Sequence, residues 1–218
     1  MEKVLSSYGR CVRLPSSRFY PEPVGAHPDT LIGKIDAEIL VCDKEESVKK
    51  ALDDIGAKYK ISNHTPGEKY PLDCGLNFLT LEEKLIGRLD IISSEAKEYA
   101  ISRGYELINI KQGYAKCSCL AVRDKIITAD EGICRALRPH GIDVIKITSG
   151  NIDLNPFEYG FIGGACGMID DDTIMFFGDI RSHPDGDTIE RVIRDHSIDI
   201  VGFDGKLCDF GGFISFSS

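Results

Sequence analysis

The sequence predicts an α/β fold in which one unit occurs four times and the units close into a ring with the chain ends. First, a glycine followed by a short apolar strand recurs as GAKYKIS (56–62), GYELINI (104–110) and GIDVIKI (141–147), and a fourth helix leads into IDIVGF (198–203). Second, each of these strands is preceded by a polar-turn hairpin and a helix. Third, the period is roughly 45 residues, which is typical of propellers and repeat arrays.

Every unit begins with two predicted strands on either side of a polar turn. The units begin near His27, Cys74, Tyr114 and Phe161, and their turns fall at Asp36, Glu82-Glu83, Arg123-Asp124 and Asp170 to Asp172. The first unit has both strands within 30–42, and the later first strands read CGLNFLTL (74–81), KCSCLAV (116–122) and GGACGMI (163–169). In a ring of such units the first strands line the central axis, so their side chains converge there.

Capping signals place the helices. Asp43 with Glu46, and Thr128 with Glu131, have the spacing of capping boxes. The first helix is expected over about 44–55, Ser93 or Ser94 begins the second, and the fourth follows His183-Pro184-Asp185. Gly56, Gly104 and Gly141 end the first three helices, as glycine does after the last helical residue.

The two chain ends are expected to form a partial fifth unit. The segment from Asp209 to Phe216 reads as a first strand and echoes Phe161-Ile162-Gly163-Gly164, while CVRL (11–14) is strand-like and no helix is expected near it. Closing the ring removes exposed sheet edges, which an open array has to protect. Residues 1–26 and 63–73 read as loops. No linker divides the chain, so we expect a single domain over residues 1–218.

Composition favours a soluble, cytoplasmic protein. Of the 218 residues, 42% are hydrophobic, and we see no signal peptide and no apolar run long enough to span a membrane. The net charge of −9 argues against nucleic-acid binding, which needs clustered lysine and arginine, and is compatible with small cationic substrates. The oligomeric state stays open.

Eight cysteines are too few for a disulfide scaffold and have poor spacing for a metal. Cys117 and Cys119 share one face of a strand, but no second cysteine or histidine pair has the spacing of a zinc site. Several cysteines lie within apolar strands, where cysteine acts as a small hydrophobe. We therefore expect neither metal nor organic cofactor.

The predicted first strands bring one histidine, several cysteines and carboxylates to the axis. A cysteine nucleophile needs a lowered pKa and a nearby proton shuttle, and a histidine with an orienting carboxylate can provide both. The candidate catalytic residues are His27, Asp29, Cys74 and Cys117, and the candidate substrate-binding residues are Asn77, Lys116, Asp130 and Cys166. Lys116 can stabilise a Cys117 thiolate, although neighbours on a strand point to opposite faces. Asp130 also fits a helix start, and Cys166 close packing at the axis.

One segment resembles a known family. His27-Pro28-Asp29-Thr30 is similar to the His-x-Asp-Thr strand of the guanidino-modifying enzymes of the pentein fold, which include arginine deiminases, amidinotransferases and dimethylarginine hydrolases. The resemblance implies that this strand carries a catalytic histidine and a guanidinium-binding aspartate. In those enzymes the next unit opens with the nucleophilic cysteine, and here Cys74 opens it.

A larger part of the chain resembles an uncharacterised bacterial family assigned to the same five-unit fold. The resembling segments are Gln112 to Cys117, Thr128 to Ile133, Tyr159 to Gly164, and Phe177 to Ile180 with His183-Pro184-Asp185. This resemblance implies a five-unit α/β-propeller of pentein type, a fold that does not by itself define an activity.

The sequence departs from the enzymes near the substrate. They often present Gly-Gly-x-x-Cys, whereas Ser215 takes the cysteine position after Gly211-Gly212, and Cys166 follows Gly163-Gly164 one residue early. Two functions therefore remain. One is a hydrolase or transferase that attacks a guanidino or amidino compound with Cys74 or Cys117. The other is a non-catalytic protein of the same fold that binds a small molecule or a protein.

Overall fold

The computed structural model describes residues 2–216, and the predicted repeat of four units is confirmed within them. Each unit holds one three-stranded sheet in which the second strand pairs antiparallel with the first and parallel with the third. In chain order the sheets are β1 (Ile32–Ile35), β2 (Glu38–Cys42) and β3 (Lys60–Ser62); β4 (Leu79–Leu81), β5 (Lys84–Gly87) and β6 (Glu106–Asn109); β7 (Cys119–Val122), β8 (Lys125–Thr128) and β9 (Asp143–Lys146); and β10 (Cys166–Met168), β11 (Thr173–Phe176) and β12 (Asp199–Val201).

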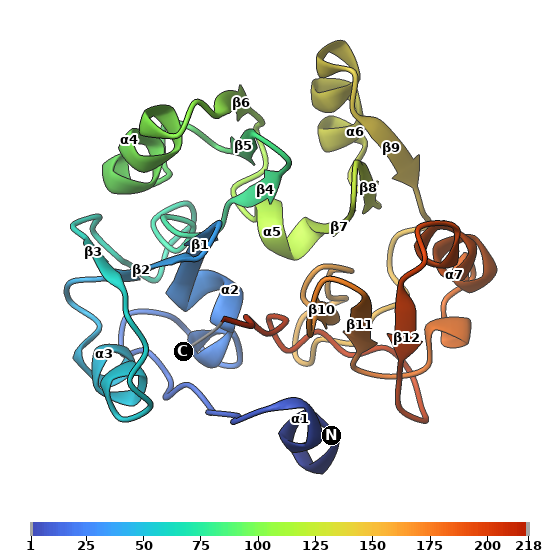
Figure 1. Cartoon of the computed structure of the whole chain (residues 1–218), viewed down its shortest axis with the longest axis horizontal. Helices are drawn as coiled ribbons and strands as arrows, with labels where there is room; N and C mark the ends of the chain where they lie inside the picture. Colours follow the sequence, from blue (N-terminus) through green and yellow to red (C-terminus); the bar gives the residue numbers. More distant parts are fainter. Residues whose placement is uncertain (1, 217–218) are drawn as a thin grey trace.

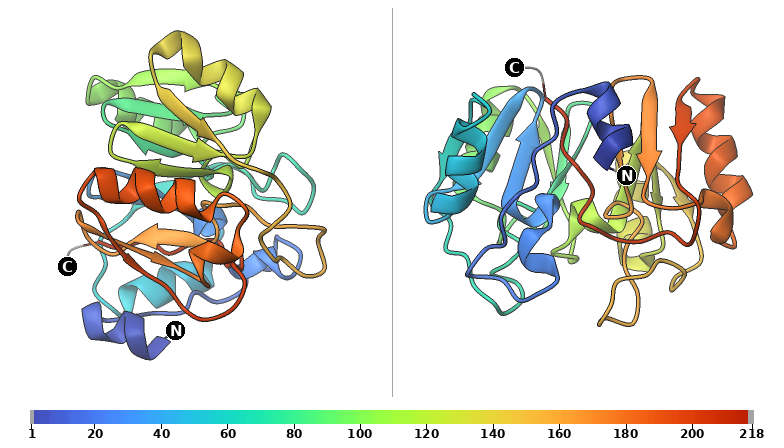
Figure 2. Two further views of the ribbon diagram at one scale, coloured as in Figure 1. Left: turned by 90° about the vertical axis from the view of Figure 1, so that its right-hand side faces the viewer. Right: turned by 90° about the horizontal axis from the view of Figure 1, so that it is seen from below.

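Two local features build each unit. The hairpin turns of the first three sheets begin at Asp36, Glu82 and Arg123, whose φ angles of 54°, 50° and 53° give the left-handed backbone that a tight hairpin turn needs. The parallel third strand needs a crossover, which a helix supplies. These helices are α3 (Glu46–Asp53), α4 (Ser94–Ser102), α6 (Glu131–Leu137) and α7 (Gly186–Asp195). They lie outside the sheets, and the first strands face the middle (Figure 1); Figure 2 shows α3 and α7 on opposite outer sides.

The helix ends follow the sequence signals only in part. Ser93 caps α4 as predicted, accepting from the Ala96 amide. Both expected capping boxes are wrong. The residue before α3 is Glu45, which makes no side-chain cap, and α6 is capped by Asp130, which accepts from the Ile133 amide at 2.9 Å. The hydroxyl of Thr128 instead accepts from the Asp130 amide, so it shapes the turn before the cap.

The chain ends differ from the predicted fifth unit. A helix, α1 (Glu2–Tyr8), occupies the N-terminal region where none was expected, and residues 11–14 form no strand. Residues 209–216 are not a strand either. They nevertheless contact two units: the Asp29 amide donates to the Gly211 carbonyl at 3.2 Å, and the Gly212 amide donates to the Gly164 carbonyl at 2.8 Å. Within residues 2–216 the sheets therefore number four.

The first strands of the units begin later in the chain than predicted, because other structure takes up the residues before them. A helical turn, α2 (Pro28–Leu31), precedes β1, and a second one, α5 (Ala115–Ser118), precedes β7. Residues 74–78 turn before β4. The 3.6-residue periodicity of these turns, and not strand alternation, decides where the candidate side chains point. No helix within residues 2–216 is long and apolar enough to cross a membrane.

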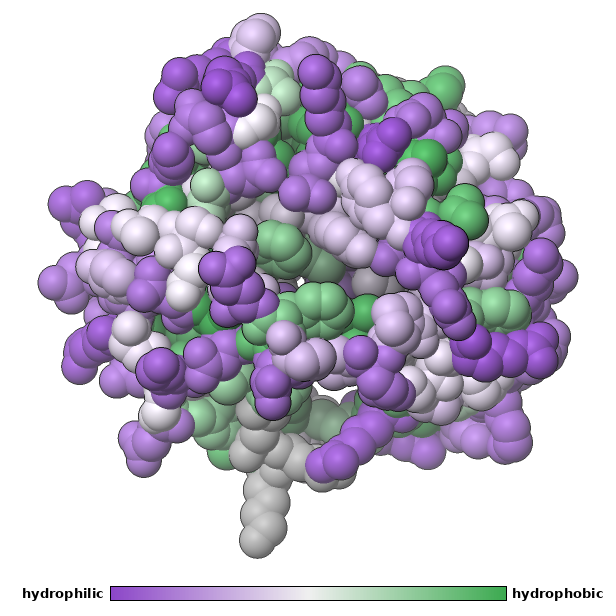
Figure 3. All heavy atoms as spheres, turned by 180° about the vertical axis from the view of Figure 1, so that it is seen from behind, coloured by the Kyte–Doolittle hydropathy of each residue, from purple (hydrophilic) through white to green (hydrophobic). Residues whose placement is uncertain are grey.

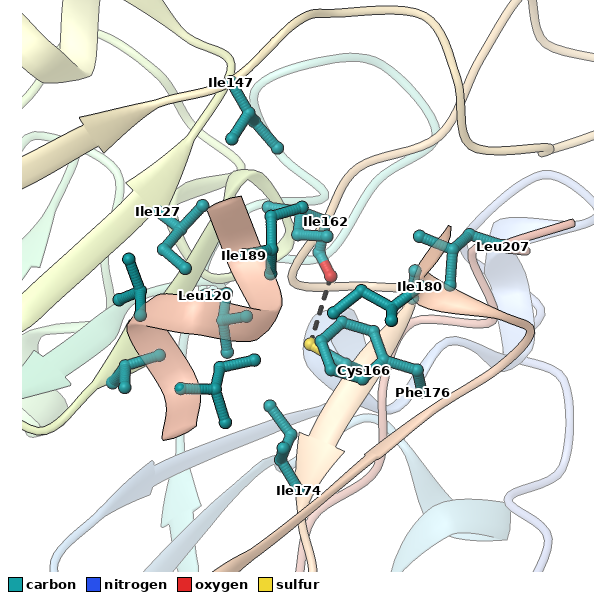
Figure 4. Close-up of a cluster of buried hydrophobic side chains, with 14 of the residues drawn as sticks. Leu120, Ile127, Ile147, Ile162, Cys166, Ile174, Phe176, Ile180, Ile189 and Leu207 are labelled. Atoms are coloured by element: carbon teal, nitrogen blue, oxygen red, sulfur yellow. Dashed lines mark hydrogen bonds between the residues drawn. The ribbon is translucent and has the colours of Figure 1, made fainter. Parts of the chain in front are cut away.

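The core is divided into clusters that join neighbouring units. The cluster in Figure 4 combines Leu120 and Ile127 of the third unit with Ile174 and Phe176 of the fourth. This agrees with the premise that one unit cannot bury its own apolar face. The C-terminal segment also contributes to the core, because Ile214 packs against the cluster of the first unit.

Truncating this shared core is expected to be costly. Phe176 is fully buried, so Phe176→Ala removes a large side chain from between two units and should lower the free energy of unfolding by about 3–5 kcal/mol. Phe157→Ala is the matched control, because Phe157 is exposed, and it should change stability by less than about 0.5 kcal/mol. Urea unfolding followed by circular dichroism measures both. Equal stability of the two variants would contradict this account of the core.

Candidate functional site

A buried thiol–carboxylate pair lies where three units meet. The Cys117 thiol, on α5, donates a hydrogen bond to Oδ2 of Asp29, on α2, with 2.7 Å between sulfur and oxygen. The side-chain nitrogen of Asn77 lies 2.9 Å from the same sulfur and also donates to the Asp29 carbonyl. Asp29 and Asn77 are fully buried, and Cys117 is 5% exposed.

Asn77 fixes the position of Cys117. Its side-chain oxygen accepts from the backbone amides of Lys116 and Cys117, at 2.8 and 3.3 Å. Two amide donors identify that atom as the oxygen, so the nitrogen must face the thiol and the Asp29 carbonyl. Every polar atom of the side chain is thus used within the protein. Asn77 was expected to bind substrate, but its contacts are those of a positioning residue.

A histidine–carboxylate pair lies near enough to the thiol for the charge of Asp209 to raise the pKa of Cys117. His27 Nδ1 is 3.8 Å from Oδ1 of Asp209. Asp209 is held by the amides of Phe161 and Gly211, each donating at 2.9 Å. Gly164 is needed here, because a β-carbon at its position would collide with the Asp209 carboxylate. A β-carbon on Gly163 would likewise collide with the Cys117 carbonyl, which accepts from the Gly163 amide.

Burial dominates the electrostatics of these four groups. Desolvation, with a smaller contribution from Asp209, raises the pKa of Asp29 to about 7. Desolvation and the charges of Asp29 and Asp209 raise the pKa of the Cys117 thiol well above its ordinary value. Burial also raises the pKa of Asp209 and lowers that of His27, in each case against their mutual attraction. Near neutral pH the thiol and the imidazole are therefore both uncharged.

One atom of the cluster lacks a partner. Oδ1 of Asp29 is buried and accepts no hydrogen bond from residues 2–216. A buried carboxylate oxygen without a donor is costly. The two carboxylates also lack a hydrogen-bonded lysine or arginine among these residues. The cluster thus combines two buried carboxylates with one acceptor atom that has no donor among the described residues.

The other predicted site residues lie elsewhere. Cys74 is buried and its thiol donates to Asp73, whose carboxylate also accepts from the Tyr114 hydroxyl. Cys166 is in the hydrophobic core, bonded to the Ile162 carbonyl at 3.2 Å (Figure 4). Asp130 caps α6 and accepts from Gln112. No cluster of three or more histidine, cysteine or acidic side chains suited to a metal occurs among the described residues.

Asp209 is the residue that sequence reasoning missed. It was noted only as the start of a fifth unit, yet its carboxylate faces the histidine predicted to be catalytic. The repeat contained the signal: Asp209 precedes Gly211-Gly212 at the start of the predicted fifth unit, as His27, Cys74 and Lys116 stand near the start of theirs. Comparing the unit starts position by position would have added Asp209 to the candidates.

Solved structures identify the fold. The chain matches SxtG, an amidinotransferase of the saxitoxin biosynthetic pathway from Microseira wollei, with a TM-score of 0.56 and 12% identity over 93% of this chain and 75% of that one. It also matches DDAH from Pseudomonas aeruginosa complexed with citrulline, with a TM-score of 0.49 and 10% identity over 82% and 70% of the two chains. The first likeness places the chain in the pentein fold of the guanidino-modifying enzymes, and identity this low speaks to fold alone.

The chain belongs to a family of unknown function, DUF6873, which matches residues 1–214. None of the curated proteins compared with the chain matches it in sequence. The α/β fold of pentein type that the resemblance implied is therefore confirmed for four three-stranded units, whereas the closed ring of five units is not shown. The activity has to be argued from the site itself.

Proposed function

We propose that this protein is a cysteine-dependent hydrolase or transferase of a guanidino or amidino compound, with Cys117 as the nucleophile. One observation carries the proposal: a fully buried aspartate holds the Cys117 thiol with one oxygen and has its other oxygen free. A planar amidinium group supplies N–H donors to such an oxygen and places its carbon beside the sulfur. Paired charge-assisted hydrogen bonds of this kind are the strong ones.

The proposed first step balances without a redox partner. Asp29 accepts the thiol proton, and a base with a pKa of about 7 suits that task at neutral pH. The sulfur attacks the amidinium carbon, so an S–C bond forms. The C–N bond to the leaving amine then breaks, and the amine takes up the proton held by Asp29. The product is an S-amidino cysteine and a free amine.

His27 is assigned to the second step. Its lowered pKa keeps the imidazole neutral near pH 7, which suits a base that activates water. Water attacks the amidino carbon and gives one proton to His27; the S–C bond then breaks, the urea or amide product leaves with its excess proton passing to solvent, and His27 returns its proton to the sulfur, which restores the thiol. In a transferase an amine replaces that water. Asp209 orients the imidazole and offsets the charge that it gains.

A cavity beside the cluster suits the rest of a cationic substrate. It has a volume of about 180 Å³ and is lined by Ser118, which follows Cys117, and by Phe161, whose amide holds Asp209. Asp130 also lines it, while no lysine or arginine does. Asp130 thus remains a candidate for substrate contact in addition to capping α6.

A binding role without chemistry is the second candidate. It is favoured by the state of Cys117, which is nearly buried and whose raised pKa keeps it a thiol. In that case the two carboxylates and the free oxygen of Asp29 bind a small cation, and no covalent step follows.

Paired alkylating reagents separate the two functions. Chloroacetamidine is cationic and chloroacetamide is its neutral analogue, and each transfers its methylene carbon to a thiolate with loss of chloride. Because Asp29 and Asp209 attract the cation, we expect Cys117 to react at least about tenfold faster with the amidine, a preference worth about 1.4 kcal/mol. Labelling rates per residue are read by mass spectrometry after digestion.

Cys11 is the internal control, because it is exposed and free, so it should show no such preference. In Asp29→Asn the preference at Cys117 should disappear. If Cys117 stays unlabelled while Cys11 reacts, and acetamidine still stabilises the protein against heat, the binding role replaces the enzymatic one. Preferential labelling of Cys74 would move the nucleophile to that residue.

A further inference from the structure

A second cavity lies between the first strands of the four units. It has a volume of about 340 Å³, and its lining includes residues of β1, β4, β7 and β10 together with residues 213–215. Two lysines face it: Lys34 of β1 and Lys116 of α5. Figure 3 shows apolar side chains gathered about a central depression on the rear face of the molecule.

The acidic side chains of this cavity are already engaged. Asp36 accepts from the Tyr105 hydroxyl and lies 3.5 Å from the guanidinium of Arg103. Glu82 pairs with Lys84 at 3.2 Å. Neither carboxylate is therefore left to balance Lys34 or Lys116.

The two lysines lack such partners. Lys34 donates to the Ser215 carbonyl at 2.6 Å, and no carboxylate of residues 2–216 lies within ion-pairing distance of it. The ammonium of Lys116 makes no hydrogen bond or ion pair within the same residues. By contrast Lys49, Lys125 and Lys146 each pair with a carboxylate at the surface. In a chain with a net charge of −9, two half-buried lysines thus face one cavity without a direct ion pair among residues 2–216; the nearest opposing charges act at longer range, Asp171 on Lys34 and Asp29 on Lys116.

The lysines also disfavour each other. Burial lowers the pKa of Lys34, and the charge of Lys116 lowers it further, while Asp171 opposes both. Two like charges in a partly desolvated cavity cost free energy that an anion between them recovers. The remaining lining is apolar or small, with Phe78, Phe213 and Gly167 among it, so the space suits a compact anion.

We propose that Lys34 and Lys116 form a binding site for a compact carboxylate or phosphate in the cavity between the first strands. The site does not depend on any chemistry at Cys117. Lys116 links the two regions, because its backbone amide is held by Asn77 of the thiol cluster and its side chain lines the anion cavity. An anion carried by the same molecule as a guanidino group, or by a separate one, meets the same two lysines.

Titration with inorganic phosphate and with acetate tests the site, read by isothermal calorimetry at constant ionic strength. We expect saturable binding of one anion per chain, weakened at least about tenfold in Lys34→Met and in Lys116→Met. Tighter binding of phosphate identifies a phosphate ligand, and tighter binding of acetate a carboxylate. Lys97→Met is the matched control, because Lys97 is also half-buried and bonded to a backbone carbonyl, that of Leu89.

Lys116→Glu keeps the test sharp if a methionine variant folds poorly. It supplies the missing carboxylate beside Lys34, so the variant should fold, keep or gain thermal stability, and bind neither anion. The proposal is overturned if neither anion binds saturably to the wild-type chain, or if Lys97→Met weakens binding as much as the two cavity variants. Labelling of Cys117 by chloroacetamidine is measured separately, so failure here leaves the proposed function standing and the reverse also holds.

Discussion

Cys117→Ala is expected to abolish formation of a covalent amidino adduct, with a loss of roughly 10⁴-fold or more in the rate of amine release. The reason is that the proposed S–C bond forms with the thiol that Asp29 holds, which is that of Cys117. The measurement is incubation with a panel of alkylguanidines, with intact mass for the adduct and amine detection for turnover. Cys117→Ser should be almost as inactive, because a serine hydroxyl hydrogen-bonded to Asp29 is a far weaker nucleophile than a thiol.

Cys74→Ala is the matched control for this result. Cys74 is as buried as Cys117, but its thiol donates to Asp73 and lies against Gly113. The Cys74 variant should therefore retain the adduct and most of the rate. Loss of the adduct in Cys74→Ala, with Cys117→Ala active, would show that the nucleophile opens the second unit, as the resemblance to the enzymes implied.

The sequence predicted correctly the features that a few neighbouring residues determine, such as hairpin turns and some helix ends. The left-handed turns at Asp36, Glu82 and Arg123 are polar residues between apolar strands, and Gly104 ends α4 with a φ of 82°. Such signals depend on a few neighbouring residues and so survive in any context. The capping boxes failed for a related reason: Thr128, Asp130 and Glu131 can all accept amide protons at one helix start, and only the path of the chain selects Asp130.

Contacts between units were beyond the reach of the sequence. Asp29 and Cys117 are 88 residues apart, and nothing in either segment shows that their side chains share a proton. The proposal of Cys117 over Cys74 rests on α5, a helical turn where a strand was expected. Likewise the C-terminal segment reaches the site through Gly211, whose left-handed φ of 73° lets it lie against His27. Tertiary packing decides each of these, and local propensity does not.

Asp29→Asn is expected to lower activity and raise stability at the same time. Without its general base the enzyme should lose roughly 10²–10⁴-fold in rate. Because the variant no longer buries a carboxylate with an unpartnered oxygen, it should unfold at pH 8 with a free energy about 2 kcal/mol higher than that of the wild type. Rates from the alkylguanidine assay and urea unfolding at pH 4 and pH 8 measure the two effects.

The pH dependence gives this prediction its sign. The pKa of Asp29 is about 7 in the folded chain and about 4 when unfolded, so the folded state holds the extra proton between those values. The contribution of Asp29 to the free energy of unfolding is fully present below pH 4 and is lost as the pH rises to about 7. The raised pKa of Asp209 makes stability change in the same direction. The free energy of unfolding of the Asp29→Asn variant should therefore decrease less between pH 4 and pH 8 than that of the wild type. Asp195→Asn, at an exposed carboxylate of α7, should follow the wild-type curve. A variant curve parallel to that of the wild type would mean that the pKa of Asp29 is not raised in the folded chain, which would contradict its role as a base matched to neutral pH.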